Sequence, residues 1–367
     1  MTPKTALSHL RYSPSVEKPE PNEPVVFEEL SRTMQHITRT MAGHYRHAYR
    51  PVHAKSHGVL VGNLTVQPNL AEPLAQGLFA IPASYPAILR FSTNPGDLLA
   101  DSVSSPRGLA VKILNVPGEM VVTHSGHTTQ DFVCINAKAF GAPNPAGFLE
   151  LIKLLDKTLE LSETVKLAVS TVARGTNAVL RSIGVHAGAL DNLGHPFTHI
   201  LGETFSTVAP IRYGDYVAKI AIVPSSPNLK ELIGQHVDAG DGFNALENLI
   251  KSFFETNTAV WVVQAQLALD SEDTPIEDAS KQWPEEKSPY QTIATLTVQP
   301  QNSYSDARQI FVDEQLSFSP WHALAAHQPL GGIMRSRLKA YEESQKYRAE
   351  RNLRAHVEPQ SIDEVPA

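Results

Sequence analysis

The sequence contains very little cysteine, and this scarcity narrows the kinds of site that it can build. Cys134 is the only cysteine among 367 residues, so an internal disulfide and a cysteine-rich zinc or iron–sulfur centre are excluded. No apolar run approaches the ~20 residues of a membrane-spanning helix, and residues 1–24 lack the apolar core of a signal peptide. No basic block occurs and the formal net charge is −7, which argues against a nucleic-acid partner. We therefore expect a globular, cytoplasmic protein without an integral membrane segment.

The composition suits one large domain or two small ones, because 42% of the residues are hydrophobic and 19% are charged. Residues 1–25 are polar and contain five prolines, as in an extended arm that docks on the protein or stays mobile. We divide the chain into an arm and helix over 1–45, a main domain over 46–354 and a polar tail over 355–367. We expect the acidic residues of the tail to be solvated.

The hydrophobic pattern predicts strands on both sides of a helical pair, without the alternation of a doubly wound sheet. Such an order favours an α+β fold with an antiparallel sheet, and so many strands can close as a barrel. Helices are predicted over residues 26–47, 145–159, 163–182 and 332–354, strands over 57–67, 88–92, 109–114, 120–123, 131–135, 213–223, 259–269 and 292–298, and an irregular connection over 300–329.

The last predicted helix carries an unusual row of side chains. Steps of four, three and four residues separate Arg337, Tyr341, Ser344 and Arg348, which places them on one helix face. A phenol is normally neutral at pH 7, but neighbouring guanidinium groups favour the phenolate and a ferric ion favours it far more. A phenolate is a hard anionic ligand for Fe(III). The alternative is an ordinary amphipathic helix with charge pairs and a packed tyrosine.

A histidine and two strand arginines are further candidates. His53 lies in the segment RPVHAKSHG, and its imidazole could move a proton between the two oxygens of a peroxide. The alternative is a structural or solvated histidine, which is also our interpretation of His57 and His124. Arg90 and Arg107 fall within or beside predicted strands, where each needs solvent or a charged partner.

Taken in chain order, these segments resemble the haem catalase family. RPVHAKSHGVLVGNLTV, LRFST, DSVSSPRGLAVKI and the Arg337-x-x-x-Tyr341 helix each match a family stretch, and residues 212–219 and Trp283-Pro284 match further landmarks. The resemblance implies a closed antiparallel β-barrel of about eight strands with flanking helices, and a haem-bearing helix near the C-terminus. It also implies haem b, whose ferric iron takes an axial tyrosinate.

The same resemblance implies a role for each candidate residue. Tyr341 takes the position of the iron ligand, with Arg337 as its charge partner and Ser344 beside the cofactor. His53 is the distal histidine, Ser92 its hydrogen-bond partner and Val52 the side chain against the haem face. Arg50, Arg90 and Arg348 correspond to the arginines that bind the haem propionates.

One stretch departs from the family pattern. Catalases carry a distal asparagine that helps orient peroxide, but residues 126–132 here read GHTTQDF. The asparagine position falls on His127 or Thr128, and either side chain could offer a hydrogen-bonding group to peroxide. The chain is also short, without the later portion in which many catalases bind NADPH. It resembles the small catalase-related peroxidases and the catalase-fold allene oxide synthases.

These residues lead to three hypotheses. The first is a haem peroxidase that reduces hydrogen peroxide or organic hydroperoxides with a small organic electron donor, with weak catalase activity, in the response to oxidative stress. The second is rearrangement of fatty-acid hydroperoxides without an external reductant, with the apolar helices over 145–182 bordering a lipid channel. The third is haem storage or sensing without catalysis. We expect a homo-oligomer, a dimer or larger.

Overall fold

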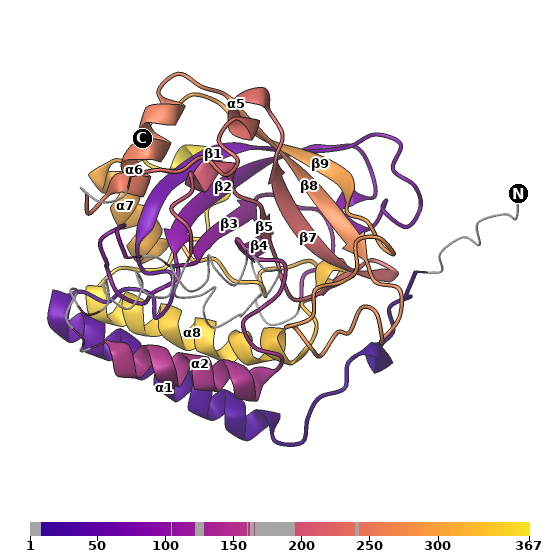
Figure 1. Ribbon diagram of the computed structural model, residues 1–367, viewed down its shortest axis with the longest axis horizontal. Coiled ribbons are helices and arrows are strands. Elements are labelled where there is room, and N and C mark those ends of the chain that lie inside the picture. The colour runs from indigo at the N-terminus through magenta and orange to yellow at the C-terminus, as the bar shows by residue number, and fades with distance from the viewer. Residues whose placement is uncertain are drawn as a thin grey trace, which may run out of the picture.

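The computed structural model describes residues 9–103, 105–121, 128–159, 161, 165, 195–238 and 242–367. In this part of the chain nine strands form one antiparallel sheet: β1 (Ser56–Val66), β2 (Ser84–Thr93), β3 (Arg107–Ile113), β4 (Gln130–Ile135), β5 (Phe205–Ser206), β6 (Ile211–Tyr213), β7 (Tyr216–Pro224), β8 (Ala259–Leu267) and β9 (Gln291–Val298). Because β5 pairs with β7, the sheet closes on itself. With β6 outside the ring as a hairpin partner of β7, eight strands form the barrel predicted from the sequence (Figure 1).

The barrel has two distinct faces, since alternate residues of a strand point to opposite sides. On the inside, Leu89 and Leu109 join a continuous apolar core. On the outside, Arg90 pairs across the sheet with Val59 on one neighbour and Ala110 on the other. The outer face of β1–β4 is itself buried, and the part formed by β2–β4 is one wall of the site described below.

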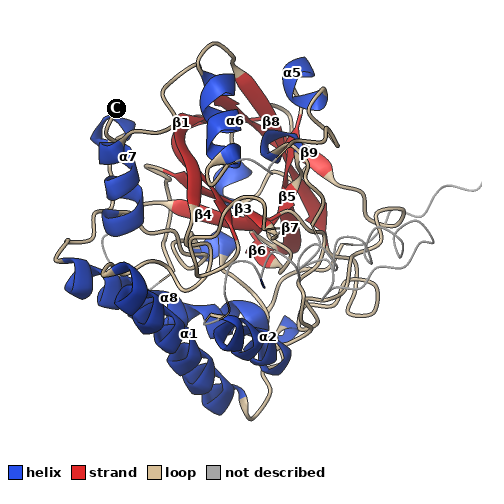
Figure 2. Cartoon of the chain, turned by 60° about the vertical axis from the view of Figure 1, so that its left-hand side comes forward, coloured by secondary structure: helices blue, strands red, loops and turns tan. Residues whose placement is uncertain are grey.

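Three long helices, α1 (Glu23–Tyr45), α2 (Pro145–Thr158) and α8 (Gly332–Asn352), lie together on one side of the barrel (Figure 2). Leu30, Ile152 and Ala340 belong to their shared apolar core. The apolar face of α2 is therefore used in helix packing. The second predicted helix, over 163–182, lies outside the described residues except for Val165. Among the helices that the structure describes, none combines the length and apolar character needed to cross a bilayer.

Several predicted elements need correction. The single strand over 213–223 is wrong, because Gly214 adopts a left-handed φ of 61° and turns the chain between β6 and β7. The irregular connection over 300–329 contains the helix α7 (Asp306–Ile310), followed by one π-helical turn over Phe311–Gln315. Of the strand predicted over 120–123, only residues 120 and 121 are described, and there Met120 forms a bridge with Leu324. The pattern also missed α5 (Pro227–Lys230), α6 (Ala245–Phe254) and β5.

Both terminal segments pack against the barrel. In the arm, the Leu10 amide donates to the Ala268 carbonyl at 2.8 Å. In the tail, Val365 is buried against the outer barrel face, and the Glu358 side chain is only 9% exposed. The prediction that the acidic residues of the tail are solvated is therefore wrong for Glu358. Its carboxylate pairs with the buried ammonium group of Lys112. The three-part division of the chain stays a prediction.

Candidate active site

A cavity of about 830 Å³, including the space at its mouth, lies between the outer face of β2–β4 and helix α8. Eight residues singled out from the sequence line its walls: Arg50, Val52, His53, Arg90, Ser92, Tyr341, Ser344 and Arg348. Segments separated by almost 300 residues therefore meet around one space.

His53 is held in an uncommon backbone conformation. Its φ is 54°, in the left-handed region that few residues other than glycine adopt, and its amide donates to the Asn94 carbonyl at 2.7 Å. The imidazole Nδ1 lies 3.1 Å from the hydroxyl of Ser92. Backbone strain of this kind persists where the surroundings hold a side chain in one orientation. Because Nδ1 is engaged by Ser92, Nε2 is the nitrogen left to exchange a proton.

The electrostatic surroundings keep His53 neutral. Burial is the largest effect, and the positive charges of Arg90, Arg337 and Arg50 add to it, so that the pKa of His53 is lowered to about 3. At neutral pH the imidazole is thus unprotonated. A buried neutral imidazole can accept a proton from a bound molecule.

Three arginines converge on Asp313 at the edge of the cavity, two on its carboxylate and one on its backbone carbonyl. Arg50 Nη1 donates to Asp313 Oδ1 at 2.9 Å, and Arg90 Nη2 lies 3.4 Å from the same oxygen. Arg348 Nη1 donates to the Asp313 carbonyl at 2.6 Å. Since one carboxylate faces three guanidinium groups, the region carries an excess of buried positive charge.

This excess charge affects the arginines themselves. Burial, followed by the charge of Arg50, lowers the pKa of Arg90 to about 9, although Asp313 opposes the change. Burial also lowers the pKa of Arg348 well below its ordinary value. In addition, the Nε atoms of Arg90 and Arg348 are buried without a hydrogen-bond partner. A ligand with several carboxylate groups would supply both the negative charge that balances these arginines and the hydrogen-bond acceptors for their unused Nε atoms.

On α8, Tyr341 receives a hydrogen bond from its neighbour one turn earlier. Arg337 Nη2 donates to the phenol oxygen at 2.5 Å, and the guanidinium carbon lies 5.0 Å from the ring centre. Tyr341, Ser344 and Arg348 line the cavity together, which confirms one helix face for these three; Arg337 does not line the cavity but contacts Tyr341. In the described chain no group of histidine, cysteine and acidic residues could hold a metal. The Tyr341 phenol oxygen, beside the Arg337 guanidinium group, is the candidate ligand for a ferric ion.

The residues present fit haem. Arginine side chains with unused donors suit its propionates, and a phenol beside a guanidinium suits its ferric iron. Val52 supplies an apolar surface at the cavity. His53 lines the same cavity and offers a neutral base.

Of the two candidates for the asparagine position, the structure describes only Thr128, and it does not place this residue at the cavity. Thr128 is exposed, does not line the cavity, and donates from its hydroxyl to Gln360 Oε1 at 3.3 Å. His127 and His124 lie outside the described residues. Cys134 does line the cavity, and burial raises the pKa of its thiol to about 12.

Sequence reasoning missed three residues that shape the cavity. Asp313 lies in the segment read as irregular, so no pattern marked it as the partner of the arginines. Gly108 has no side chain that a pattern could mark, although it faces His53 directly. His322 lines the cavity from the same irregular segment, where the only signal was the histidine itself.

A closed eight-stranded barrel with a tyrosine-bearing helix beside it is the catalase fold. Solved structures with this fold include a fungal catalase, which matches with a TM-score of 0.60 and 18% identity over 85% of this chain and 62% of its own. Catalase A from Saccharomyces cerevisiae matches with a TM-score of 0.58 and 18% identity, covering 84% of this chain and 63% of its own. A bacterial catalase gives a TM-score of 0.56 at 17% identity, with 86% and 60% covered.

The sequence comparison agrees with the fold. Catalase ifgD from Penicillium roqueforti is 25% identical over 297 residues, which cover 75% of this chain and 59% of that protein. No family model matches the chain. The chain is thus a distant relative of the catalases, and it spans about three fifths of the length of those it matches.

Proposed function

We propose that this protein binds haem b in the cavity and acts as a small catalase-related peroxidase, reducing hydrogen peroxide or organic hydroperoxides with an organic electron donor. The observation that carries the proposal is a single cavity lined by Tyr341, His53 and three buried arginines. The distant relationship to catalases supports the same chemistry.

The residues of the cavity divide into those that hold haem and those that handle the substrate. Tyr341 would bind the iron, and the three arginines Arg50, Arg90 and Arg348 would bind the propionates. When bound, haem supplies the electrons that reduce the peroxide bond. The donation from Arg337 stabilises negative charge on the Tyr341 oxygen.

His53 performs the proton transfer. Its Nε2 accepts the proton of one peroxide oxygen and delivers it to the other, which leaves as water or an alcohol. Ser92 fixes the ring through Nδ1, so the same nitrogen faces the substrate throughout. Because the surrounding arginines and burial keep the imidazole neutral, it is ready to accept a proton at neutral pH.

An absorption spectrum of the purified protein, followed by titration with hydrogen peroxide and with cumene hydroperoxide, tests the proposal. We expect haem bands in the spectrum and consumption of both oxidants in the presence of an organic donor. His53→Ala should keep the haem and lose at least about 100-fold in turnover, and Tyr341→Phe should alter the iron spectrum. His36→Ala, on the exposed surface of α1, is the control and should change neither. A colourless, folded protein would contradict the proposal.

The reaction products distinguish the alternative of hydroperoxide rearrangement. A peroxidase yields an oxidised donor and an alcohol, whereas a rearrangement yields an isomer or epoxide and consumes no donor. The lipid-channel argument for rearrangement has no support from α2, whose residues do not line the cavity. Assembly as a dimer or larger stays a prediction, which sedimentation of the purified protein can check.

A further inference from the structure

The tail of the chain returns to the barrel after α8 and packs behind one wall of the cavity. Helix α8 ends at Asn352, and Leu353 leaves it with a left-handed φ of 55° and a residue exposure of 89%. Residues 353–355 are all exposed. We call residues 356–366 the strap, and residues 311–319, against which the strap packs, the wall segment.

The wall segment has the cavity on one side and the strap on the other. Residues 317–319 line the cavity. On the strap side, the Val357 amide donates to the Gln315 carbonyl at 3.0 Å, and Val365 belongs to the same buried apolar cluster as Phe318. A movement of the strap would therefore withdraw support from the cavity wall.

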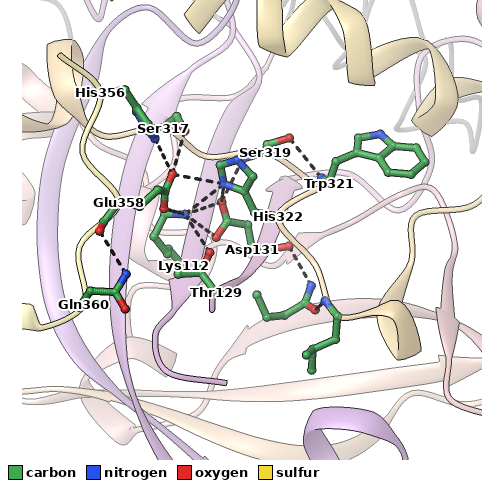
Figure 3. Close-up of polar contacts among 12 residues, drawn as sticks. Lys112, Thr129, Asp131, Ser317, Ser319, Trp321, His322, His356, Glu358 and Gln360 are labelled. Carbon is green, nitrogen blue, oxygen red and sulfur yellow. Dashed lines mark hydrogen bonds and ion pairs between the residues drawn. The ribbon is translucent and has the colours of Figure 1, made fainter. Parts of the chain in front are cut away.

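Glu358 fastens the middle of the strap (Figure 3). Its Oε2 lies 3.0 Å from Lys112 Nζ, and its Oε1 accepts a hydrogen bond from the Ser317 hydroxyl at 3.3 Å. Next along the strap, Gln360 Oε1 accepts from the Thr128 hydroxyl at 3.3 Å. Because Lys112 belongs to β3 and Ser317 to the wall segment, one carboxylate joins the strap, the wall segment and the barrel.

This contact can open without leaving a buried charge unpaired. Lys112 Nζ lies 2.9 Å and 3.0 Å from the two carboxylate oxygens of Asp131, so the lysine keeps an anion when Glu358 moves away. Glu358 keeps His356, whose Nε2 lies 2.7 Å from its Oε1 and which belongs to the strap itself. Separating a buried ion pair is costly when it leaves one charge uncompensated, and here both sides retain a partner.

The strap also has local structure of its own. It contains the turn Ile362–Glu364, in which Ser361 and Glu364 form a capping box. Beyond this turn, Arg308 Nε donates to the Pro366 carbonyl at 2.7 Å and holds the far end. A segment with internal hydrogen bonds can leave and return as a unit, with the exposed residues 353–355 as its hinge.

We propose that the strap is a latch on the cavity: opening at the Glu358 contact loosens the wall segment and admits haem, and closing retains it. The strands β2–β4 and the helix α8, which form other sides of the cavity, cannot part without breaking regular hydrogen bonding, whereas the wall segment is built of short turns. The inference rests on the proposed function for the identity of the molecule that enters.

Hydrogen exchange tests the coupling of strap and wall without haem. The amides of Val357 and Leu316 donate to the carbonyls of Gln315 and Phe311, and so report on the strap and on the wall segment. We expect Glu358→Gln to speed exchange at both amides by one common factor of about ten, as the loss of a charge-assisted hydrogen bond allows. The amides of β2 should not change. Faster exchange at Val357 alone would overturn the proposal, because the strap would then move without the wall.

Two further variants control this measurement. Asp363→Asn makes the same change of charge at an exposed position, where the carboxylate contacts Ser361 within the strap, and it should leave exchange at Leu316 unchanged. Val365→Ala weakens the apolar contact of the strap without touching its charges, so it should speed exchange at both amides; this variant serves if Glu358→Gln fails to fold. Equal effects of Asp363→Asn and Glu358→Gln, or no effect of Val365→Ala, would refute the latch.

The kinetics of haem binding test the gate itself. A gate changes the association and dissociation rates by equal factors and leaves Kd unchanged, whereas a side chain that stabilises bound haem changes Kd. For Glu358→Gln we expect haem uptake, and haem transfer from the protein to apomyoglobin, each to be about tenfold faster, with Kd unchanged. Faster transfer at an unchanged rate of uptake would contradict the gate.

The outcomes separate this inference from the proposed function. If the protein binds no haem, the proposed function fails, and the exchange measurements alone decide whether the strap controls the wall. If haem binds and both of its rates are indifferent to Glu358→Gln, the proposed function stands and the latch is wrong.

Discussion

Gly108 lies directly against the imidazole of His53. A Cβ atom at this glycine would be 2.6 Å from His53 Cε1 and 2.7 Å from Nδ1, and 3.0 Å from the Ser92 hydroxyl. These distances are too short for a carbon atom, so the absence of a side chain on β3 is what gives the histidine its place beside Ser92.

The first prediction follows for Gly108→Ala. The new methyl group must displace His53 or the strand, which we expect to cost about 1–3 kcal/mol of unfolding free energy and to separate the imidazole from Ser92. Peroxide turnover should fall at least tenfold while haem binding persists. Gly43→Ala is a matched control, because it lies inside α1 and no atom lies within 4 Å of the position that a Cβ would take there. It should be neutral or stabilising by about 1 kcal/mol; equal effects of the two changes would contradict the assignment.

Asp313 is the carboxylate partner of the arginines, and its removal should destabilise the protein. Asp313→Asn removes the charge of the carboxylate that Arg50 and Arg90 contact, so we expect a loss of about 3 kcal/mol in the unfolding free energy. Because an anionic ligand replaces the missing charge, added haem should stabilise the variant more than the original protein. Thermal melts with and without haem measure both effects. The surface change Asp215→Asn, in an exposed ion pair with Arg11, is the control, expected within about 0.5 kcal/mol.

A third prediction concerns acid sensitivity. His327 Nε2 accepts the Leu78 amide at 2.9 Å, which only an unprotonated nitrogen can do, and burial lowers the pKa of His327 to about 4. The unfolded chain takes up the proton first, so stability falls as the pH drops from about 6.5 to about 4, by up to about 3 kcal/mol for this group.

Urea unfolding at several pH values checks this dependence. His327→Gln retains an acceptor for Leu78 without the titration, so its stability should decline less between pH 6.5 and 4. Some decline will remain, because the pKa values of His53 and His199 are also lowered, chiefly by burial, to about 3 and about 4. Parallel curves for the variant and the original protein would rule out His327 as a source of the acid sensitivity.

The fourth prediction concerns Cys134. Burial raises the pKa of its thiol to about 12, and the reactive species is the thiolate. The folded protein should therefore resist alkylation by iodoacetamide at pH 8, and denaturant should expose the thiol to complete reaction. Mass spectrometry of both samples provides the measurement. Rapid labelling of the folded protein would show that the cavity wall opens to solvent.

The sequence predicted most of the barrel and most of the cavity, for reasons that can be stated residue by residue. Strands such as β1 and β8 show alternating hydrophobic residues or runs of β-branched residues. Arg337, Tyr341 and Arg348 lie within one regular helix, where the spacing of residues along the sequence determines the direction in which their side chains point. Asp313 and His322 could not be placed in this way. They enter the site from a segment of short turns, whose course depends on packing against the barrel and not on local periodicity.

The tail shows a related limit of local reasoning. Glu358 belongs to a polar segment without periodicity, so its composition indicates solvent. Its burial depends on Lys112, some 250 residues earlier, whose charge in an otherwise apolar wall requires carboxylate partners. Only the three-dimensional arrangement reveals such a pairing.

The pairing of β1 with both β2 and β9 has a consequence for biosynthesis. β2 emerges from the ribosome soon after β1, but residues 294–297, which pair with residues 63–66 of β1, follow more than 200 residues later. Throughout that interval the growing polypeptide must carry an open β-sheet edge, which is prone to associate with other chains. Final closure of the barrel is then a long-range, slow event. Protein yield in cells should accordingly respond to chaperone supply and to the rate of translation.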